Sequence, residues 1–220
     1  MVPNDIPRDC SDFEILVARG TSENSFADGG KFGVIIGDPI VSNVTQVLQG
    51  VQGYPVQKGR SESSWLSHQQ YPADDNYVEN LETGGNDIVN RIVAQSEKCP
   101  EQRFAIVGYS QGAGVVHKAA EYIPAELQHK IMSISIFGDP SEGENVGNIW
   151  PRDWPYGLQN KVRRVCAEGD PVCDETATCF YMHLTYIRPL YIDPAVEYIV
   201  DRFLSNLRMI PSQSEPQTSG

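Results

Sequence analysis

The chain has 220 residues, of which 40% are hydrophobic and 21% are charged, so a folded domain with a proper core is expected rather than a disordered chain. No cluster of Lys and Arg interrupts the formal net charge of −12, which disfavours nucleic acid and anionic lipid as partners. The longest apolar runs fall well short of the roughly 18 residues of a membrane-spanning helix, so no membrane span is predicted.

Five short stretches rich in β-branched residues predict buried strands, and helical patterns separate them. Asp38 is expected to cap the first helix, with Pro39 at its first position and Gly50 after its end. In the last helix Asp193 is the expected cap and Pro194 the opening residue. The predicted strands are residues 13–18, 54–57, 104–108, 132–137 and 162–166, and the two middle helices are residues 86–97 and 112–123.

This alternation predicts an α/β fold, a three-layer α/β/α sandwich with a central, mainly parallel five-stranded sheet. Residues 10–210 are expected to form one domain, preceded by an arm of residues 1–9 and followed by a disordered tail of residues 211–220. Residues 58–80 and 139–160 are long irregular stretches, and loops of that length usually build a binding site.

The five cysteines are scattered and do not form the paired C-x-x-C clusters that favour zinc, so disulfides are the better interpretation. The N-terminal residues 1–5 lack the charged and apolar regions of a signal peptide, and a mature chain with an added Met1 is the interpretation. Asn43-Val44-Thr45 is an N-glycosylation sequon, a triplet that arises often by chance and therefore indicates glycosylation only weakly.

The segment from Gly108 to Gly112 fits G-x-S-x-G, and it lies between a predicted strand and a predicted helix. This is the pattern of a nucleophile elbow, in which the turn is so sharp that side chains at the two glycines would collide with backbone. Ser110 is thereby exposed at the carboxyl end of the sheet, beside the N–H groups and positive dipole of a helix start. The alternative is a glycine-rich turn that only closes a βα unit.

A serine nucleophile also needs a base, and four histidines are available. His68 precedes the serine, whereas α/β-hydrolases have the order Ser, then Asp or Glu, then His. His117 lies about two helical turns beyond Ser110, and His129 lies in a polar connection, so both are expected at the surface. His183, after the fifth predicted strand, is the candidate base.

Asp139 and Asp170 each follow a predicted strand and are the two candidates for the acid that orients the base. Asp170 is favoured because a bond between Cys166 and Cys173 would hold its loop in a small ring. Asp139 precedes Pro140 and is expected to cap the following turn instead.

These residues resemble the cutinase family and its relatives among acetylxylan esterases. The resemblance rests on Gly108 to Ala113, on Ala18 to Glu23 after the first strand, and on Cys166 to Cys173 followed by His183. It implies a cutinase-like α/β-hydrolase domain that is secreted and cleaves esters without metal or organic cofactor. Implied roles are nucleophile for Ser110, acid for Asp170, base for His183 and oxyanion donors for Thr21 and Gln111, with disulfides Cys10–Cys99 and Cys166–Cys173 and Cys179 left over.

The stretch from Phe180 to Ile187 around His183 is unusually apolar, and either its alternate residues pack inward or they form a rim for acyl chains or polyester. Expected substrates are cutin, other polyesters and short to medium acyl esters, cleaved by a monomer; strict preference for acetate would indicate a carbohydrate esterase. A flavodoxin-like protein holding phosphate at Arg19 to Ser22 is a remote alternative, and a hydrolase fold retained only for binding is another.

Overall fold

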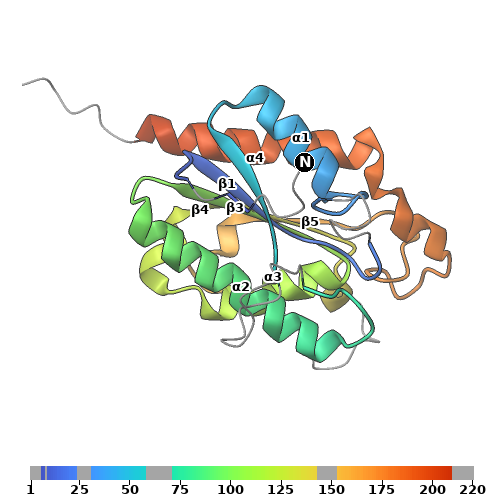
Figure 1. Ribbon diagram of the computed structural model, residues 1–220. Helices are drawn as coiled ribbons and strands as arrows, with labels where there is room; N and C mark the ends of the chain where they lie inside the picture. The colour runs from blue at the N-terminus through green and yellow to red at the C-terminus, as the bar shows by residue number, and fades with distance from the viewer. Residues whose placement is uncertain (1–5, 8, 24–30, 58–70, 143–152, 210–220) are drawn as a thin grey trace, which may run out of the picture.

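The computed structural model describes residues 6, 7, 9–23, 31–57, 71–142 and 153–209. Its centre is a sheet of five parallel strands in the order β2-β1-β3-β4-β5. Helices lie on both faces of this sheet, so the predicted three-layer α/β/α fold is confirmed (Figure 1). The strands are β1 (Phe13–Ala18), β2 (Val51–Pro55), β3 (Arg103–Tyr109), β4 (Ile131–Phe137) and β5 (Val162–Val165), and the helices are α1 (Gly37–Val47), α2 (Tyr77–Lys98), α3 (Gln111–Tyr122) and α4 (Pro189–Met209).

The sheet separates two apolar cores because the side chains of each strand alternate between its faces. On one face Phe13 and Ile15 of β1 pack with residues of α1 and α4. On the other face Leu16 of β1 and Ile106 of β3 pack with residues of α2 and α3. The middle strands β1 and β4 are buried along their whole length, whereas β5 is an edge strand with partly exposed residues, so its prediction as a buried strand is wrong.

The helix α2 begins nine residues before the predicted start at Asn86, within a stretch predicted to be irregular. The low helix propensity of glycine makes Gly84 and Gly85 unfavourable within a helix. Both residues face α3, however, and an added Cβ at Gly84 would lie 2.8 Å from Val115 Cγ1. Close packing of α2 on α3 therefore outweighs the low helix propensity of glycine.

Two predicted helix starts are also wrong. Asp38 lies inside the first turn of α1, where its carboxylate accepts the Phe32 N–H at 2.9 Å instead of capping the helix. The helix α4 starts at Pro189, so Pro194 lies inside it and Asp193 is not its cap. Burial of Ile192 against the sheet supplies the packing that extends this helix toward its N-terminus.

The structure contains both disulfides that the family resemblance implies. Cys10 is bonded to Cys99, which joins the start of β1 to the end of α2, and Cys166 is bonded to Cys173. Cys179 is an exposed free thiol.

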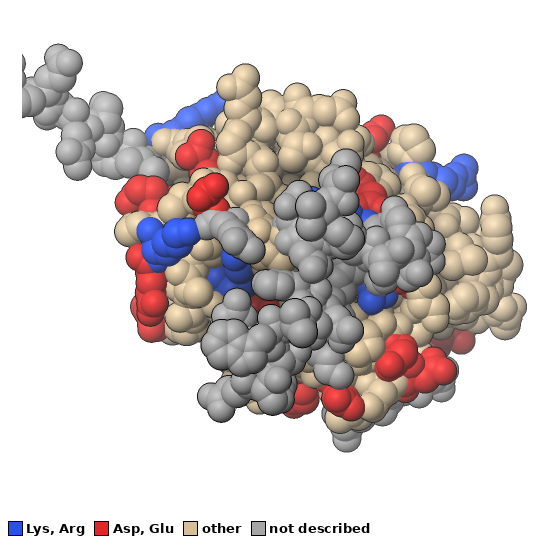
Figure 2. Space-filling model, in the orientation of Figure 1, with Lys and Arg blue, Asp and Glu red and all other residues tan. Residues whose placement is uncertain are grey.

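No helix within the described ranges is both long and apolar enough to cross a bilayer. On the face shown in Figure 2, acidic and basic side chains are scattered in small groups among uncharged ones. The sequon residue Asn43 lies in α1 and is partly exposed. The predicted tail and most of the predicted N-terminal arm lie outside the described residues.

Replacing Cys10 and Cys99 together by Ser is expected to lower the free energy of unfolding by about 4 to 5 kcal/mol, because the bond closes a loop across 89 positions of the chain. Urea unfolding followed by circular dichroism measures the change. The control is Cys179→Ser, which removes an exposed thiol outside any disulfide and should leave the midpoint unchanged. Equal midpoints for wild type and the double variant would contradict the prediction.

Asp87 of α2 holds the end of β2. Its carboxylate accepts the Gln57 N–H at 2.7 Å and the Tyr54 hydroxyl at 3.0 Å. Burial raises the pKa of Asp87 to about 6, although these two hydrogen bonds favour the ionised form. Because the folded pKa lies above the usual value, Asp87 contributes stability below about pH 4 that is lost as pH rises through about 6.

Asp87→Asn removes this titration, and the variant should therefore gain stability relative to wild type as the pH rises from 4 to 7. The expected gain is about 2 kcal/mol in the difference between the two unfolding free energies. Urea titrations at pH 4, 5, 6 and 7 measure it, with Asp193→Asn on the exposed face of α4 as control. If the difference between the two unfolding free energies does not change with pH, the pKa of Asp87 is not raised in the folded protein.

Candidate active site

Ser110 lies in the sharp turn between β3 and α3, at the carboxyl end of the sheet. Its backbone has φ 54° and ψ −121°, a region that residues other than glycine rarely occupy. Its N–H donates to the carbonyl of Phe137 at 2.9 Å, which ties the turn to the end of β4. A strained serine between a strand and a helix is the geometry of a nucleophile elbow.

Close packing around this turn explains the two glycines of the motif. An added Cβ at Gly108 would lie 2.5 Å from the carbonyl oxygen of Gly112, and one at Gly112 would overlap the carbonyl of Ala18 in β1. A side chain at either position would therefore displace backbone, and the turn could not place Ser110 where it lies.

His183 and Asp170 form a buried hydrogen-bonded pair. Nδ1 of His183 lies 2.8 Å from Oδ2 of Asp170 and 3.0 Å from Oδ1, and the two residues are 3% and 0% exposed. His183 lies in a 3-10 helix, Phe180–Ile187, rather than in the loop that the sequence predicts. Since Nδ1 faces the carboxylate, Nε2 is the ring atom left to accept a proton.

Asp170 is held by several donors within the loop that the Cys166–Cys173 disulfide closes. The Tyr186 hydroxyl donates to Oδ2 at 2.6 Å and the Val172 N–H to Oδ1 at 2.9 Å, in addition to the bond with His183. Burial alone would raise the pKa of Asp170, but these hydrogen bonds outweigh it and hold the pKa below its usual value. Asp170 is therefore ionised at neutral pH, which suits a carboxylate that orients an imidazole.

The imidazole of His183 is also packed by residues of other elements. Tyr109, the residue before Ser110, donates its hydroxyl to the His183 carbonyl at 2.6 Å and stacks on the ring with centroids 4.9 Å apart. Gly138, with φ 53°, lies so close that an added Cβ would be 2.7 Å from Cε1 of His183 and 3.0 Å from Oδ2 of Asp170. These contacts restrict rotation of the ring.

A cavity of about 780 Å³ brings the predicted site residues together. Ser110 and His183 both line it, and so do Thr21 and Gln111. The ring of His183 is hydrogen-bonded to Asp170, and within the described residues no bond joins it to the Ser110 hydroxyl. Such bonds are often long in ligand-free sites and shorten when a substrate binds.

The loop after β1 is organised by a buried carboxylate. One oxygen of Glu23 accepts the Gly20 N–H at 2.7 Å, and the other accepts the Ile35 N–H at 2.9 Å. Burial raises the pKa of Glu23 even though these bonds and Arg19 oppose the shift. The turn presents Thr21 to the cavity, and neither its N–H nor its hydroxyl is bonded to another described residue.

Gln111 is the first residue of α3, and its side chain is fixed away from the cavity. Its Nε2 donates to the Asp74 carbonyl at 2.8 Å, and its Oε1 accepts from Nδ2 of Asn80 at 3.3 Å. The backbone N–H of a first helical residue has no acceptor within its helix, and no described residue accepts this one. That N–H and the helix dipole are available to a negative oxygen in the cavity.

His117, His129 and Asp139 do not line the cavity that Ser110 lines. His117 is 1% exposed, so its prediction as a surface residue is wrong: it is buried by Trp154 and by a bond to Asp139, partners distant in sequence. His129 is exposed as predicted, and His68 lies outside the described residues. Asp139 accepts the Ser141 N–H at 3.0 Å, which confirms its predicted role in the turn after β4.

The apolar stretch around His183 divides into buried and exposed residues. Thr185 and Tyr186 are buried with His183, whereas Phe180 and Tyr181 are 59% and 71% exposed. Phe180 and Leu184 line the cavity next to His183, so inward packing explains only part of this stretch. The exposed members are Phe180, Tyr181, Leu184 and Ile187, and Val34 adds another exposed apolar side chain to the cavity wall.

Four residues that support the site were not identified from the sequence: Tyr109, Gly138, Tyr186 and Glu23. Tyr186 and Gly138 act through contacts between segments far apart in the chain, for which the sequence holds no local signal. Tyr109 occupies the variable position of G-x-S-x-G, and Glu23 lies two residues beyond Thr21, so both could have been suspected from their positions.

Comparisons with known proteins agree with this geometry. The chain is 30% identical over 181 residues to a cutinase of Botryotinia fuckeliana, covering 81% of this chain and 78% of that protein. It resembles the structure of a Trichoderma reesei cutinase in complex with a phosphonate inhibitor, with 27% identity, a TM-score of 0.64 and coverage of 88% and 77%. The acetyl xylan esterase core of Trichoderma reesei shares the fold, with 19% identity, a TM-score of 0.65 and coverage of 88% and 100%.

The cutinase family model matches residues 9–203, which include every residue of the site described above. The chain therefore belongs to the cutinase family of carboxylic ester hydrolases.

Proposed function

We propose that this chain is a secreted serine esterase in which Ser110 is the nucleophile, His183 the base and Asp170 the acid that orients it. The observation that carries the assignment is the position of Ser110, on a strained elbow, in the same cavity as a histidine whose Nδ1 is bonded to a buried carboxylate. Nucleophile, base and orienting acid are the three parts that activation of a serine hydroxyl requires.

In the first half of the reaction, Ser110 Oγ adds to the ester carbonyl carbon while Nε2 of His183 takes its proton. The tetrahedral intermediate then expels the alcohol, which receives that proton from His183, and the acyl group remains on Ser110. In the second half, water adds to the acyl carbon as His183 accepts a proton again, and the acid leaves as Ser110 recovers its hydrogen. Asp170 stays ionised throughout and stabilises the imidazolium.

The negative oxygen of each tetrahedral intermediate would be bound by the N–H groups of Thr21 and Gln111, with the Thr21 hydroxyl as a third donor. Both residues line the cavity, and their N–H groups are not bonded to other described residues. The Gln111 side chain is hydrogen-bonded to the Asp74 carbonyl, and the Glu23 carboxylate accepts the Gly20 N–H in the loop after β1. These bonds hold the two donors in place before substrate binds. Such preorganised donors are often the largest contribution to catalysis of acyl transfer.

The exposed apolar side chains beside the cavity favour esters with longer acyl chains, including polyesters such as cutin, over acetate esters. Leu184 and Val34, 45% and 42% exposed, both line the cavity, and Phe180 extends the apolar surface next to His183. Apolar surface of this kind gains free energy when it binds an acyl chain, whereas an acetyl group covers little of it.

A phosphate-binding role of the flavodoxin type is disfavoured by the loop after β1. The Gly20 N–H, which a phosphate would need, already donates to the Glu23 carboxylate and is not available to an anion. Secretion is favoured by two disulfides, since such bonds persist in oxidising compartments. We assign the active form as a monomer because one chain supplies every residue of the proposed mechanism.

Ser110→Ala should abolish ester hydrolysis and leave the unfolding midpoint nearly unchanged. Wild-type protein treated with a p-nitrophenyl alkylphosphonate should release one nitrophenolate per chain and gain the phosphonyl mass at Ser110, and the variant should do neither. Intact mass spectrometry and peptide mapping measure the adduct. Labelling of another residue, or hydrolysis by the variant, would overturn the assignment, and an unlabelled wild type would favour a fold retained only for binding.

Leu184→Ser is expected to lower kcat/KM for p-nitrophenyl octanoate about fivefold relative to p-nitrophenyl acetate, because one apolar contact with the acyl chain is lost. Leu207→Ser is a matched control, since Leu207 is 46% exposed but does not line the cavity. A wild type that cleaves acetate and rejects octanoate would indicate a carbohydrate esterase instead.

A further inference from the structure

A second cluster of Ser, His and Asp lies next to the active site, on the far side of the turn after β4. Nε2 of His117 lies 2.8 Å from Oδ2 of Asp139, and the Ser141 hydroxyl donates to the same Oδ2 at 2.8 Å. His117 and Asp139 are 1% exposed and Ser141 is 7% exposed. These three residues are called the buried cluster below.

The geometry of the buried cluster excludes a second catalytic triad. A triad needs the acid on one ring nitrogen and the serine on the other. Here Ser141 Oγ lies 3.2 Å from Nε2 of His117, the same nitrogen that contacts Asp139. Nδ1 of His117 is buried and has no partner among the described residues. The cluster therefore cannot pass a proton from Ser141 through the ring to Asp139.

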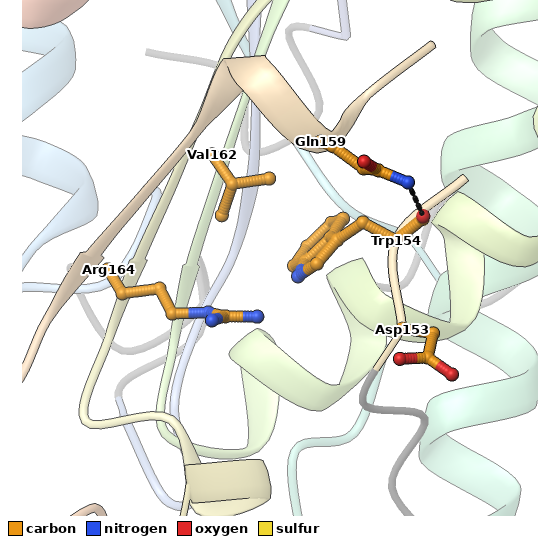
Figure 3. A pocket seen from close by; sticks show the side chains of 5 residues that line it. All are labelled: Asp153, Trp154, Gln159, Val162 and Arg164. Atoms are coloured by element: carbon orange, nitrogen blue, oxygen red, sulfur yellow. Dashed lines mark hydrogen bonds between the residues drawn. The ribbon is translucent and has the colours of Figure 1, made fainter. Parts of the chain in front are cut away.

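The outer side of the buried cluster is closed by Trp154. The ring centroids of His117 and Trp154 are 4.4 Å apart, and the Trp154 indole points into a second pocket, between Val162 and Arg164 (Figure 3). Trp154 thus lies between His117 and that pocket. A ligand in that pocket would contact the Trp154 indole and not His117. The contacts of His117 are therefore with other residues of the protein.

What the buried cluster holds is the turn Gly138-Asp139-Pro140. Oδ1 of Asp139 accepts the Ser141 N–H at 3.0 Å, and the Asp139 carbonyl accepts the Glu142 N–H at 3.2 Å. His117 reaches this turn from α3, the helix that begins directly after Ser110. The hydrogen bonds of Asp139 therefore stabilise the turn internally and also connect it to α3.

The same turn forms part of the active-site wall. Gly138 abuts the His183 ring at the Cε1 and Nδ1 edge, which leaves no space for a methyl group. Pro140 lines the cavity beside Ser110. Just before the turn, the Phe137 carbonyl accepts the Ser110 N–H, and the Gly138 N–H donates to the Val165 carbonyl at 3.0 Å. Movement of this turn would release the imidazole on one side.

We propose that His117, Asp139 and Ser141 are positioning residues for His183, acting through the Gly138 backbone, an inference that rests on the proposed function. The Asp139 carboxylate is central to this role, because it is hydrogen-bonded both to His117 of α3 and to Ser141 of the turn. A loosened turn lets the imidazole rotate out of line with Ser110, and a misplacement of about 1 Å at a reacting group can cost about a hundredfold in rate.

Hydrolysis of p-nitrophenyl butyrate by wild type, His117→Leu, His117→Gln and Asp139→Asn tests this inference. His117→Leu removes the donor to Asp139 and should lower kcat at least about tenfold while KM changes less than about twofold. His117→Gln keeps an N–H donor near the position of Nε2 and should recover most of kcat. Asp87→Asn is the matched control, a carboxylate of α2 that likewise accepts a backbone N–H and a side-chain hydroxyl and lies outside the active-site cavity.

The far-downfield proton NMR signal of a histidine bonded to a carboxylate gives a second readout. Asp139→Asn should shift or broaden the His183 Nδ1 proton, and Asp87→Asn should not. If His117→Leu does not fold, Ser141→Ala, which removes one donor to the same carboxylate, is judged by the same kcat criterion.

Unchanged kcat in the folded cluster variants, or equal losses in them and in Asp87→Asn, would overturn the inference. Failure of the proposed function is distinguished by Ser110→Ala. If Ser110→Ala remains active, the proposed function is wrong. If Ser110→Ala is inactive and the cluster variants are fully active, only the proposed positioning role is wrong.

Discussion

Because all five strands run in the same direction, every strand ends at the same edge of the sheet, and the site depends on this constraint. Thr21 follows β1 and Ser110 follows β3, and these strands are neighbours in the sheet. The turn with Gly138 follows β4, and Asp170 follows the adjacent β5. The two pairs adjoin in the sheet because β3 is bonded to β4, so residues after four neighbouring strands line one cavity.

The cost of this arrangement is a concentration of buried polar groups at that edge, and its buried carboxylates Asp170 and Glu23 are hydrogen-bonded by donors from several segments. Asp170 receives donors from His183, Tyr186 and a backbone N–H, and Glu23 bridges the N–H groups of Gly20 and Ile35. An unpaired buried carboxylate would cost several kcal/mol, so these bonds stabilise the loops as well as orient them. The polar network is the reason that loops can hold site residues in fixed positions.

How much of this could be predicted from the sequence depends on the range of the interaction involved. The fold class follows from local alternation of strands and helices, and Ser110 from a five-residue motif whose steric logic is local. The start of α2 could not be predicted, because Gly84 and Gly85 are favourable only against α3. His117 was misplaced for the same reason, since its burial depends on Asp139 and Trp154, 22 and 37 positions away. The roles of Asp170 and His183 stay a proposal that the geometry supports.

The two buried His–Asp pairs differ in which ring nitrogen they use, and this difference separates a group that can act on substrate from one that holds backbone. His183 binds its acid through Nδ1, which leaves Nε2 toward a cavity that Ser110 also lines. His117 binds through Nε2 and turns Nδ1 into a buried site without a partner among the described residues. The same residue types are therefore arranged for different roles: the geometry of the first pair suits the proton exchange of the proposed mechanism, and that of the second suits fixing the turn against which the first is packed.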